Sequence, residues 1–128
     1  MSRSVRLINS GSGQPLIARL SLAINPWTRL RGLFGTSPLQ PDQGLWLEPC
    51  NSVHMIGMRY ALDVVFVDKA GLVVRLVPHL RPWQLSPIVR GARAAIELAA
   101  GSIERLDIRL GQTLRYDTTE ATQGAPHP

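Results

Sequence analysis

Residues 44–68 read GLWLEPCNSVHMIGMRYALDVVFVD, and this stretch says most about the fold. It places the one cysteine of the chain, one of its three histidines, two of its three methionines and an arginine between two apolar runs, and an aspartate inside the second run. The second run, residues 61–67, is apolar on both faces except at Asp63, a pattern typical of a strand covered on both sides of a sheet. Polar and sulfur-containing side chains in such a setting indicate either a buried polar network or a binding site.

The residues after this stretch predict a hairpin. Asp68 and Gly71 occupy the first and fourth positions of a type I turn, and residues 72–77 would return antiparallel. Outward from this hairpin, alternating or apolar runs predict further short strands at 5–9, 15–23, 44–47, 52–55, 94–99 and 112–116.

Two short helices are also expected. One covers about two turns near residues 25–35, where Asn25 suits the N-cap and Pro26 the first helical position. The other is a single turn that begins at Ser102. Closely spaced short strands with Gly/Pro turns predict a mainly β fold, mostly antiparallel, either β-sandwich-like or a partly open barrel.

Length and composition favour one domain. A chain of 128 residues can bury one core but not two. We predict a single β-rich domain over residues 1–116 and a disordered tail over 117–128, because the tail is nearly free of apolar side chains. No apolar run reaches the roughly 18 residues of a membrane span, and no apolar segment typical of a signal peptide follows the basic start. With a single cysteine, the chain is expected to be cytoplasmic.

The net charge of +5 comes from thirteen arginines and one lysine. A basic balance of this kind can serve nucleic acid through phosphate contacts. Here the arginines are spread singly along the chain, with few aromatic residues between them, so nucleic-acid binding is disfavoured.

Several motifs, in order, resemble the domain-of-unknown-function 192 family, small bacterial and archaeal proteins with a β-sandwich-like fold. The matching pieces are Arg29-Leu30-Arg31-Gly32-Leu33, Gly44-Leu45, the run 62–68 followed by Gly71, Glu97 with Leu98-Ala99-Ala100-Gly101, and the turn at Gly111. The resemblance covers roughly residues 15–116. It implies the fold and leaves the function open, because the family implies no particular catalytic activity.

The chain departs from the family pattern at two places. Many members have Trp-Met-Lys-Asn-Thr before the central strand, whereas this chain has the pentapeptide at 54–58, HMIGM. The usual aspartate after the last glycine is Gln112. A role carried by the family's lysine or asparagine therefore cannot be transferred to this chain.

Cys50, His54 and Met58 are spaced four residues apart, so an extended chain would point them to one face. Thiolate, imidazole and thioether suit a soft metal, and Cys50 with His54 could instead form a nucleophile and base. No second cysteine or nucleophile motif reinforces either reading. The alternative is that the methionines and the cysteine fill the core. We therefore predict no cofactor, and we keep these three residues as weak candidates.

Asp63 needs a partner, because an ionised carboxylate left alone in a core is costly. Arg29 and Arg59 are the expected partners, through a bidentate pair. Either arginine, if turned toward a pocket, would bind a carboxylate or phosphate. Glu97 lies on the less apolar face of its strand, and we expect it to be exposed or paired with an arginine.

The sequence favours a non-enzymatic small binding or accessory module with a pocket near His54, Arg59 and Asp63. Met58 and Arg29 would complete the ligand-binding set, and the partner would be a small anionic ligand or a protein. One alternative is a hydrolase-like or metal-dependent enzyme that uses Cys50 and His54. The other is a protein–protein interaction domain that uses an open sheet edge or the loop around Trp83.

Overall fold

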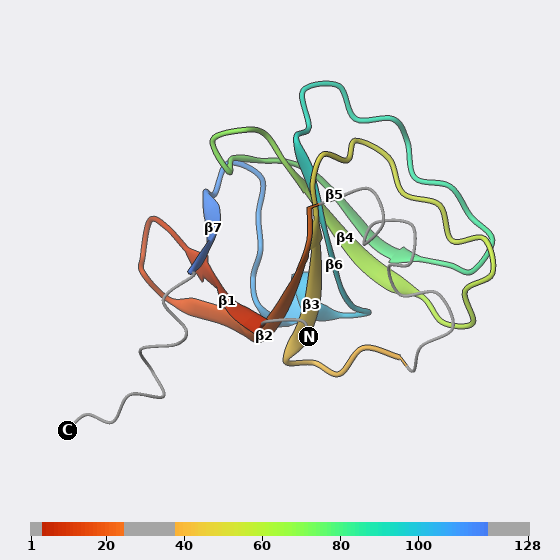
Figure 1. Ribbon diagram of the computed structural model, residues 1–128, viewed down its shortest axis with the longest axis horizontal. Helices are drawn as coiled ribbons and strands as arrows, with labels where there is room; N and C mark the ends of the chain where they lie inside the picture. Colours follow the sequence, from red (N-terminus) through yellow and green to blue (C-terminus); the bar gives the residue numbers. More distant parts are fainter. Residues whose placement is uncertain (1–3, 25–37, 118–128) are drawn as a thin grey trace.

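The computed structural model describes residues 4–24 and 38–117. Seven strands form one mixed, open sheet in the order β5-β4-β6-β3-β2-β1-β7 (Figure 1). Their bounds are β1 (Ser4–Asn9), β2 (Pro15–Ala23), β3 (Gln43–Leu47), β4 (Leu62–Val67), β5 (Val73–Leu80), β6 (Ala94–Ala99) and β7 (Leu114–Asp117). Only β2 and β3 pair in parallel; the other neighbours are antiparallel. The prediction of a mainly β, mostly antiparallel fold is confirmed.

One short helix, α2 (Ser102–Arg105), lies within the described residues, as predicted. The helix expected near 25–35 falls outside them, and so does Arg29. The predicted strand at 52–55 is reduced to a single bridge between His54 and Leu85. β7 extends to Asp117, the residue at which the sequence predicted the tail to begin. Asp117 lies opposite Arg6 in the antiparallel pairing with β1, and the two side chains form an ion pair. Residues 118–128 lie outside the described part.

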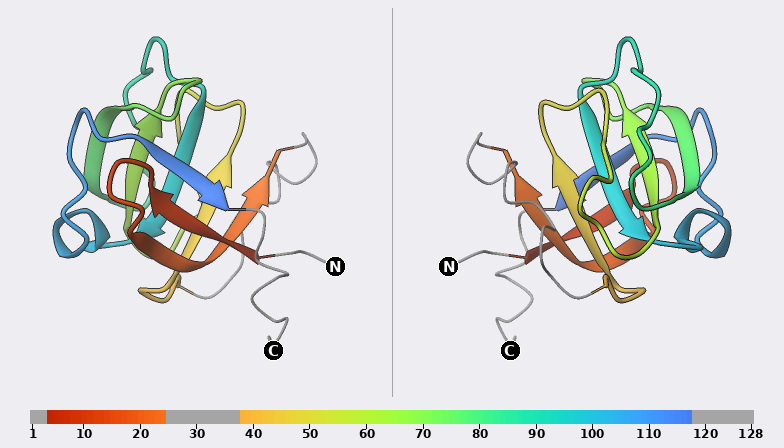
Figure 2. Two further views of the ribbon diagram at one scale, coloured as in Figure 1. Left: turned by 90° about the vertical axis from the view of Figure 1, so that its left-hand side faces the viewer. Right: turned by 90° about the vertical axis from the view of Figure 1, so that its right-hand side faces the viewer.

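The sheet curls until its two edge strands meet at one corner (Figure 2). Leu72, just before β5, forms an isolated bridge with Thr113, just before β7. The Leu114 amide donates to the Gly71 carbonyl oxygen at 2.8 Å, and the Val73 amide donates to the Gln112 carbonyl oxygen at 2.8 Å. The fold is therefore a partly open barrel, in which a few hydrogen bonds join the first and last strands of the sheet order.

Apolar side chains pack on both faces of the sheet. Inside the curl, one cluster gathers residues from most of the strands, among them Leu7, Leu20, Val65, Ile96 and Leu114. On the outer face of β4 and β6, a second cluster includes Met55, Val64, Phe66 and Val89. All six residues of β4 are buried, which confirms the prediction of a strand covered on both sides.

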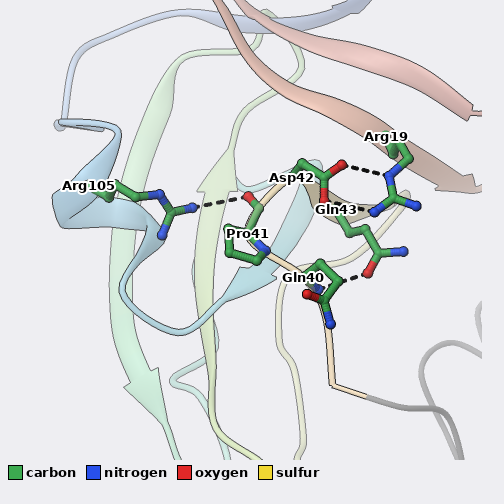
Figure 3. Close-up of polar contacts among 6 residues, drawn as sticks. All are labelled: Arg19, Gln40, Pro41, Asp42, Gln43 and Arg105. Carbon is green, nitrogen blue, oxygen red and sulfur yellow. Dashed lines mark hydrogen bonds and ion pairs between the residues drawn. The ribbon is translucent and has the colours of Figure 1, made fainter.

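Two arginines fix the chain where it enters β3 (Figure 3). Arg19 on β2 donates to both carboxylate oxygens of Asp42, at 2.7 and 2.8 Å, and this hydrogen bonding lowers the pKa of Asp42. Arg105 on α2 donates to the carbonyl oxygen of Pro41 at 3.1 Å. These contacts fasten the end of the long β2–β3 connection to β2 on one side and to α2 on the other.

The corner where β5 and β7 meet requires glycine at position 71. Gly71 has φ +86°, and a Cβ there would lie 2.3 Å from the carbonyl oxygen of Leu114. We predict that Gly71→Ala lowers the free energy of unfolding by about 2 kcal/mol or more, as it adds a backbone clash to the cost of a left-handed alanine. Urea denaturation measures this loss.

Gly91→Ala is the matched control. Gly91 has nearly the same φ, +85°, but nothing lies within 4 Å of its Cβ position. This variant should lose only about 1 kcal/mol, the cost of the left-handed backbone alone. Equal losses in the two variants would show that the corner is not closely packed.

Candidate functional site

The region singled out by the sequence folds as a two-stranded ribbon. Residues 50–60 run antiparallel to residues 81–93, and the two segments lie side by side beyond β4 and β5 (Figure 1). We call these two segments the ribbon. Backbone hydrogen bonds of 2.8–2.9 Å connect them along their length; the donors are the amides of Cys50, Met55, Trp83, Ser86 and Val89.

The register of the ribbon separates an inner from an outer face. His54 and Leu85 face each other as a non-hydrogen-bonded pair, because the flanking bonds run from Met55 to Gln84 and from Ser86 to Val53. Val53 and Met55 are buried against the outer face of the sheet, and His54, between them, is exposed. Strand alternation accounts for this division.

Four large apolar side chains of the ribbon remain in solvent. The exposed fractions are 48% for Ile56, 68% for Trp83, 68% for Leu85 and 73% for Ile88. Trp83 also has a positive φ of 68°, an uncommon conformation for a residue with a bulky side chain. Its amide donates to the Met55 carbonyl oxygen at 2.8 Å, so the unusual backbone is fixed by the ribbon itself while the indole stays outside the core.

The ribbon is basic throughout. It carries His54 and four arginines, all exposed, and no aspartate or glutamate; the arginines are Arg59, Arg81, Arg90 and Arg93. Arg93 pairs with Glu48 at 3.1 Å. The other three have no ion pair within residues 4–24 and 38–117. The ribbon therefore presents apolar side chains together with uncompensated positive charge.

Asp63 does not join this surface. Its side chain is 1% exposed and shares a face of β4 with Val65 and Val67, which belong to the cluster inside the curl. Oδ1 accepts from the His79 amide at 2.9 Å, and Oδ2 accepts from the amides of Gly101 and Ile103 at 3.1 and 2.8 Å.

The expected pair of Asp63 with Arg59 is wrong. Backbone amides replace the guanidinium, and Arg59 is exposed on the ribbon. Within the described part of the chain no arginine pairs with this carboxylate; Arg29 lies outside that part. Asp63 acts as a cap supplied by β4 to the first turn of α2, and it also fixes the end of β5.

The structure does not bring the side chains of Cys50, His54 and Met58 to one face. The chain turns after Met55, where the Met58 amide donates to the Met55 carbonyl oxygen and Gly57 takes φ +83°. The prediction of a common face assumed an extended chain from Cys50 to Met58, and this turn interrupts the extended chain. The half-buried Cys50 thiol donates to the Ser52 carbonyl oxygen at 3.1 Å, and Met58 packs partly buried on the outer cluster. The described residues contain no group of three or more His, Cys, Asp or Glu placed to hold a metal ion.

The environment of Glu97 differs from the predicted one, in which this side chain was exposed or paired with an arginine. It is only 8% exposed, and burial raises its pKa from 4.5 to about 7. Its cross-strand neighbours are Leu45 on β3 and Val64 on β4. No hydrogen bond or ion pair reaches its carboxylate from any residue that the structure describes. The sequence carried only a weak indication that Glu97 is buried. The other residues on its face of β6 are alanines, which fit a covered face as well as an exposed one.

The comparisons with known proteins agree with this fold. The family model of DUF192, described as "Uncharacterized ACR, COG1430", matches residues 7–116. The chain belongs to the DUF192 family. The resemblance seen in the sequence is therefore confirmed, and the family is one whose function is uncharacterised.

Archaeal relatives of this DUF192 domain carry a family name only. A UPF0127 protein of Thermococcus sibiricus is 30% identical over 127 residues, which is 95% of this chain and 81% of the relative. A UPF0127 protein of Thermococcus gammatolerans is 30% identical over 118 residues, covering 89% and 76% of the two chains.

Two crystal structures are similar to the DUF192 domain. One, described as a candidate transcription regulator from Sinorhizobium meliloti 1021, has a TM-score of 0.73, 26% identity and coverage of 91% and 94% of the two chains. The other, a protein of unknown function from Novosphingobium aromaticivorans, has a TM-score of 0.74, 21% identity and coverage of 89% and 84%. The second likeness shows the fold alone. In the described part of the DUF192 domain, no helix is long and apolar enough to cross a membrane.

Replacement of Asp63 by alanine should be strongly destabilising. The change removes a carboxylate that accepts three backbone amides and leaves those amides without their acceptor. Hydrogen bonds to a charged group contribute about 1.5–3 kcal/mol each, so we expect a loss of about 3 kcal/mol or more in the free energy of unfolding. Denaturant titration of Asp63→Ala measures it.

Asp68→Ala is the matched control, because Asp68 accepts the amides of Ala70 and Leu72 in an exposed turn. Solvent can replace that carboxylate, so the loss should be about 1 kcal/mol. A melting temperature of Asp63→Ala close to that of Asp68→Ala would contradict the capping role of Asp63.

The raised pKa of Glu97 predicts a pH-dependent stability. Between pH 4.5 and about 7 the folded protein holds a proton that the unfolded chain releases, so the free energy of unfolding falls as the pH rises through this range. The shift corresponds to about 3 kcal/mol in total. Glu97→Gln should remove this slope and be the more stable protein at pH 8, as measured by urea denaturation at several pH values.

Glu104→Gln provides the control, since Glu104 is exposed on the neighbouring helix α2. It should keep the wild-type slope. Parallel pH profiles for wild type and Glu97→Gln would mean that Glu97 titrates at an ordinary value.

Proposed function

We propose that this DUF192 domain is a non-enzymatic binding module that docks an acidic, partly apolar segment of a partner protein on the outer face of the ribbon. The observation that carries the proposal is the exposure of four large apolar side chains on a hydrogen-bonded ribbon: Ile56, Trp83, Leu85 and Ile88. Large contiguous patches of exposed apolar side chains mark interaction sites, and these four side chains are carried by two hydrogen-bonded segments.

The chemistry of the ribbon supports an acidic partner. Arginine and tryptophan are the residue types most often found at binding hot spots. The exposed arginines and the absence of carboxylates from residues 50–60 and 81–93 favour a negatively charged partner and speed its encounter. The same charge opposes the pairing of the ribbons of two copies of this chain.

The rigidity of the ribbon supports specific binding. Its two segments are connected by backbone hydrogen bonds, and its inner face packs on the sheet through Val53, Met55 and Val89. A surface that is already ordered loses little conformational entropy when a partner docks. His54, exposed directly across from Leu85, favours a protein over a lipid bilayer, because acyl chains offer its imidazole no hydrogen-bond partner.

A synthetic peptide tests the proposal. The probe is an acetylated decapeptide of alternating glutamate and leucine; its counterpart with lysine in place of glutamate is the charge control. The acidic peptide should shift the NMR signals of His54, Ile56, Trp83 and Leu85, and the basic peptide should leave them unchanged.

Leu85→Ala should weaken binding of the acidic peptide at least fivefold, equivalent to about 1 kcal/mol. Leu110→Ala is the matched control, because Leu110 is 62% exposed, close to the 68% of Leu85, but lies outside the ribbon. It should bind as wild type does.

Three results would overturn the proposal. They are no binding of the acidic peptide, NMR shifts confined to residues outside the ribbon, or equal affinity of Leu85→Ala and wild type for the peptide. If vesicles of phosphatidylglycerol bind the protein and the peptide does not, the surface serves a membrane and the proposed protein partner is wrong.

A further inference from the structure

Trp83 occupies a turn position that suits glycine. The Gln84 amide donates to the Arg81 carbonyl oxygen at 3.1 Å, so residues 81–84 form a four-residue turn. Pro82 holds the second position, where its ring fixes a negative φ, and Trp83 holds the third position with φ +68°. This combination is typical of a type II turn, which favours glycine or asparagine at the third position. A residue with a large side chain adopts this backbone only at a cost in free energy.

Backbone contacts hold the turn in place. The Trp83 amide donates to the Met55 carbonyl oxygen at 2.8 Å, and the Arg81 amide donates to Oε1 of Gln84 at 2.8 Å. These bonds explain how the left-handed backbone of Trp83 persists. They do not explain the tryptophan, because they use only its main chain and glycine would form them without the steric cost.

The indole of Trp83 does not offset that cost by joining the core. It is 68% exposed and belongs to none of the buried apolar clusters of the described residues. Trp46 provides the contrast, because its ring packs edge-on against Tyr116 and its Nε1–H donates to Glu48 at 2.9 Å. The Nε1–H of Trp83 donates to no residue that the structure describes. Both the apolar ring and the polar N–H of this side chain are therefore available to a partner.

We propose that Trp83 is the anchor of the docking surface, and this inference rests on the proposed function. The indole ring packs against an apolar side chain of the partner, and the Nε1–H donates to a carboxylate next to that side chain. Residues 50–60 and 81–93 contain no carboxylate that would compete for this donor. The partner is thus a segment in which an acidic and an apolar residue are neighbours.

Two general observations support an anchoring role. Residues held in unfavourable backbone conformations cluster at binding and catalytic sites, where the side chain is needed in spite of its cost. Tryptophan is also enriched among the few interface residues that contribute most of the binding free energy. The positive φ of Trp83 and its exposed ring bring both observations together at one position of the ribbon.

Two replacements of Trp83 separate binding from stability. Trp83→Gly removes the indole and relieves the backbone, so its urea midpoint should equal or exceed that of wild type. Its affinity for the acidic glutamate–leucine decapeptide should nevertheless fall at least about tenfold. Trp83→Phe keeps an aromatic ring but has no N–H donor, so it should bind the peptide about threefold more weakly than wild type.

Asp107→Gly is the matched control. Asp107 is another exposed residue with a positive φ, +54°, and it lies outside the ribbon. Its replacement by glycine relieves a left-handed backbone in the same way, but it should leave the affinity for the peptide as in wild type.

The proposal is overturned if Trp83→Gly binds the peptide as wild type does, or if its urea midpoint falls below that of wild type, since the indole would then support the fold. Equal affinity of Trp83→Phe and wild type would overturn the hydrogen bond of the indole. If Leu85→Ala loses binding and Trp83→Gly keeps it, the anchor is wrong and the proposed function stands. If wild type does not bind the peptide, both are wrong.

Discussion

The carboxylate of Asp63 is the contact on which the functional parts of this structure depend. From the second position of the fully buried strand β4, it accepts the amide of His79 near the end of β5 and the amides of Gly101 and Ile103 at the start of α2. The second segment of the ribbon begins directly after β5. One buried charge therefore determines where β5 stops and how α2 sits beside the sheet, and its own ionisation is compensated by the three amides.

The two faces of the central strands serve different purposes. Inside the curl, the side chains of β4 and β6 are apolar except for Asp63, whose carboxylate accepts backbone amides. On the outer face, the ribbon covers β4 through Val53 and Met55, so its own alternation must direct His54 and Leu85 into solvent. The exposure of His54 and Leu85 is thus a geometric consequence of the buried positions beside them. Glu97 lies on this outer face, between two apolar clusters.

Sequence patterns predicted the parts of the fold that local periodicity controls. The strands, the hairpin after Asp68 and the helical turn at Ser102 follow from alternation and turn residues. The environment of polar residues could not be predicted, because it depends on contacts between distant segments. Asp63 was expected to need a partner, but its partners are amides 16 to 40 residues away. His54 and Leu85 are paired across a proline-rich connection that has no periodicity of its own. The sequence therefore indicated His54, Arg59 and Trp83 separately but did not predict that their two segments pair.

Native-state hydrogen exchange of the Trp83 amide shows whether the ribbon is a preformed surface held by the sheet. This amide donates to Met55 in a segment that has no regular strand. If the account is right, it exchanges with a protection close to that of the amides of β4, because both open only when the domain unfolds. Exchange at the rate of an unstructured peptide would contradict the account, since the ribbon would then be a loose loop and its exposed side chains would form no defined surface.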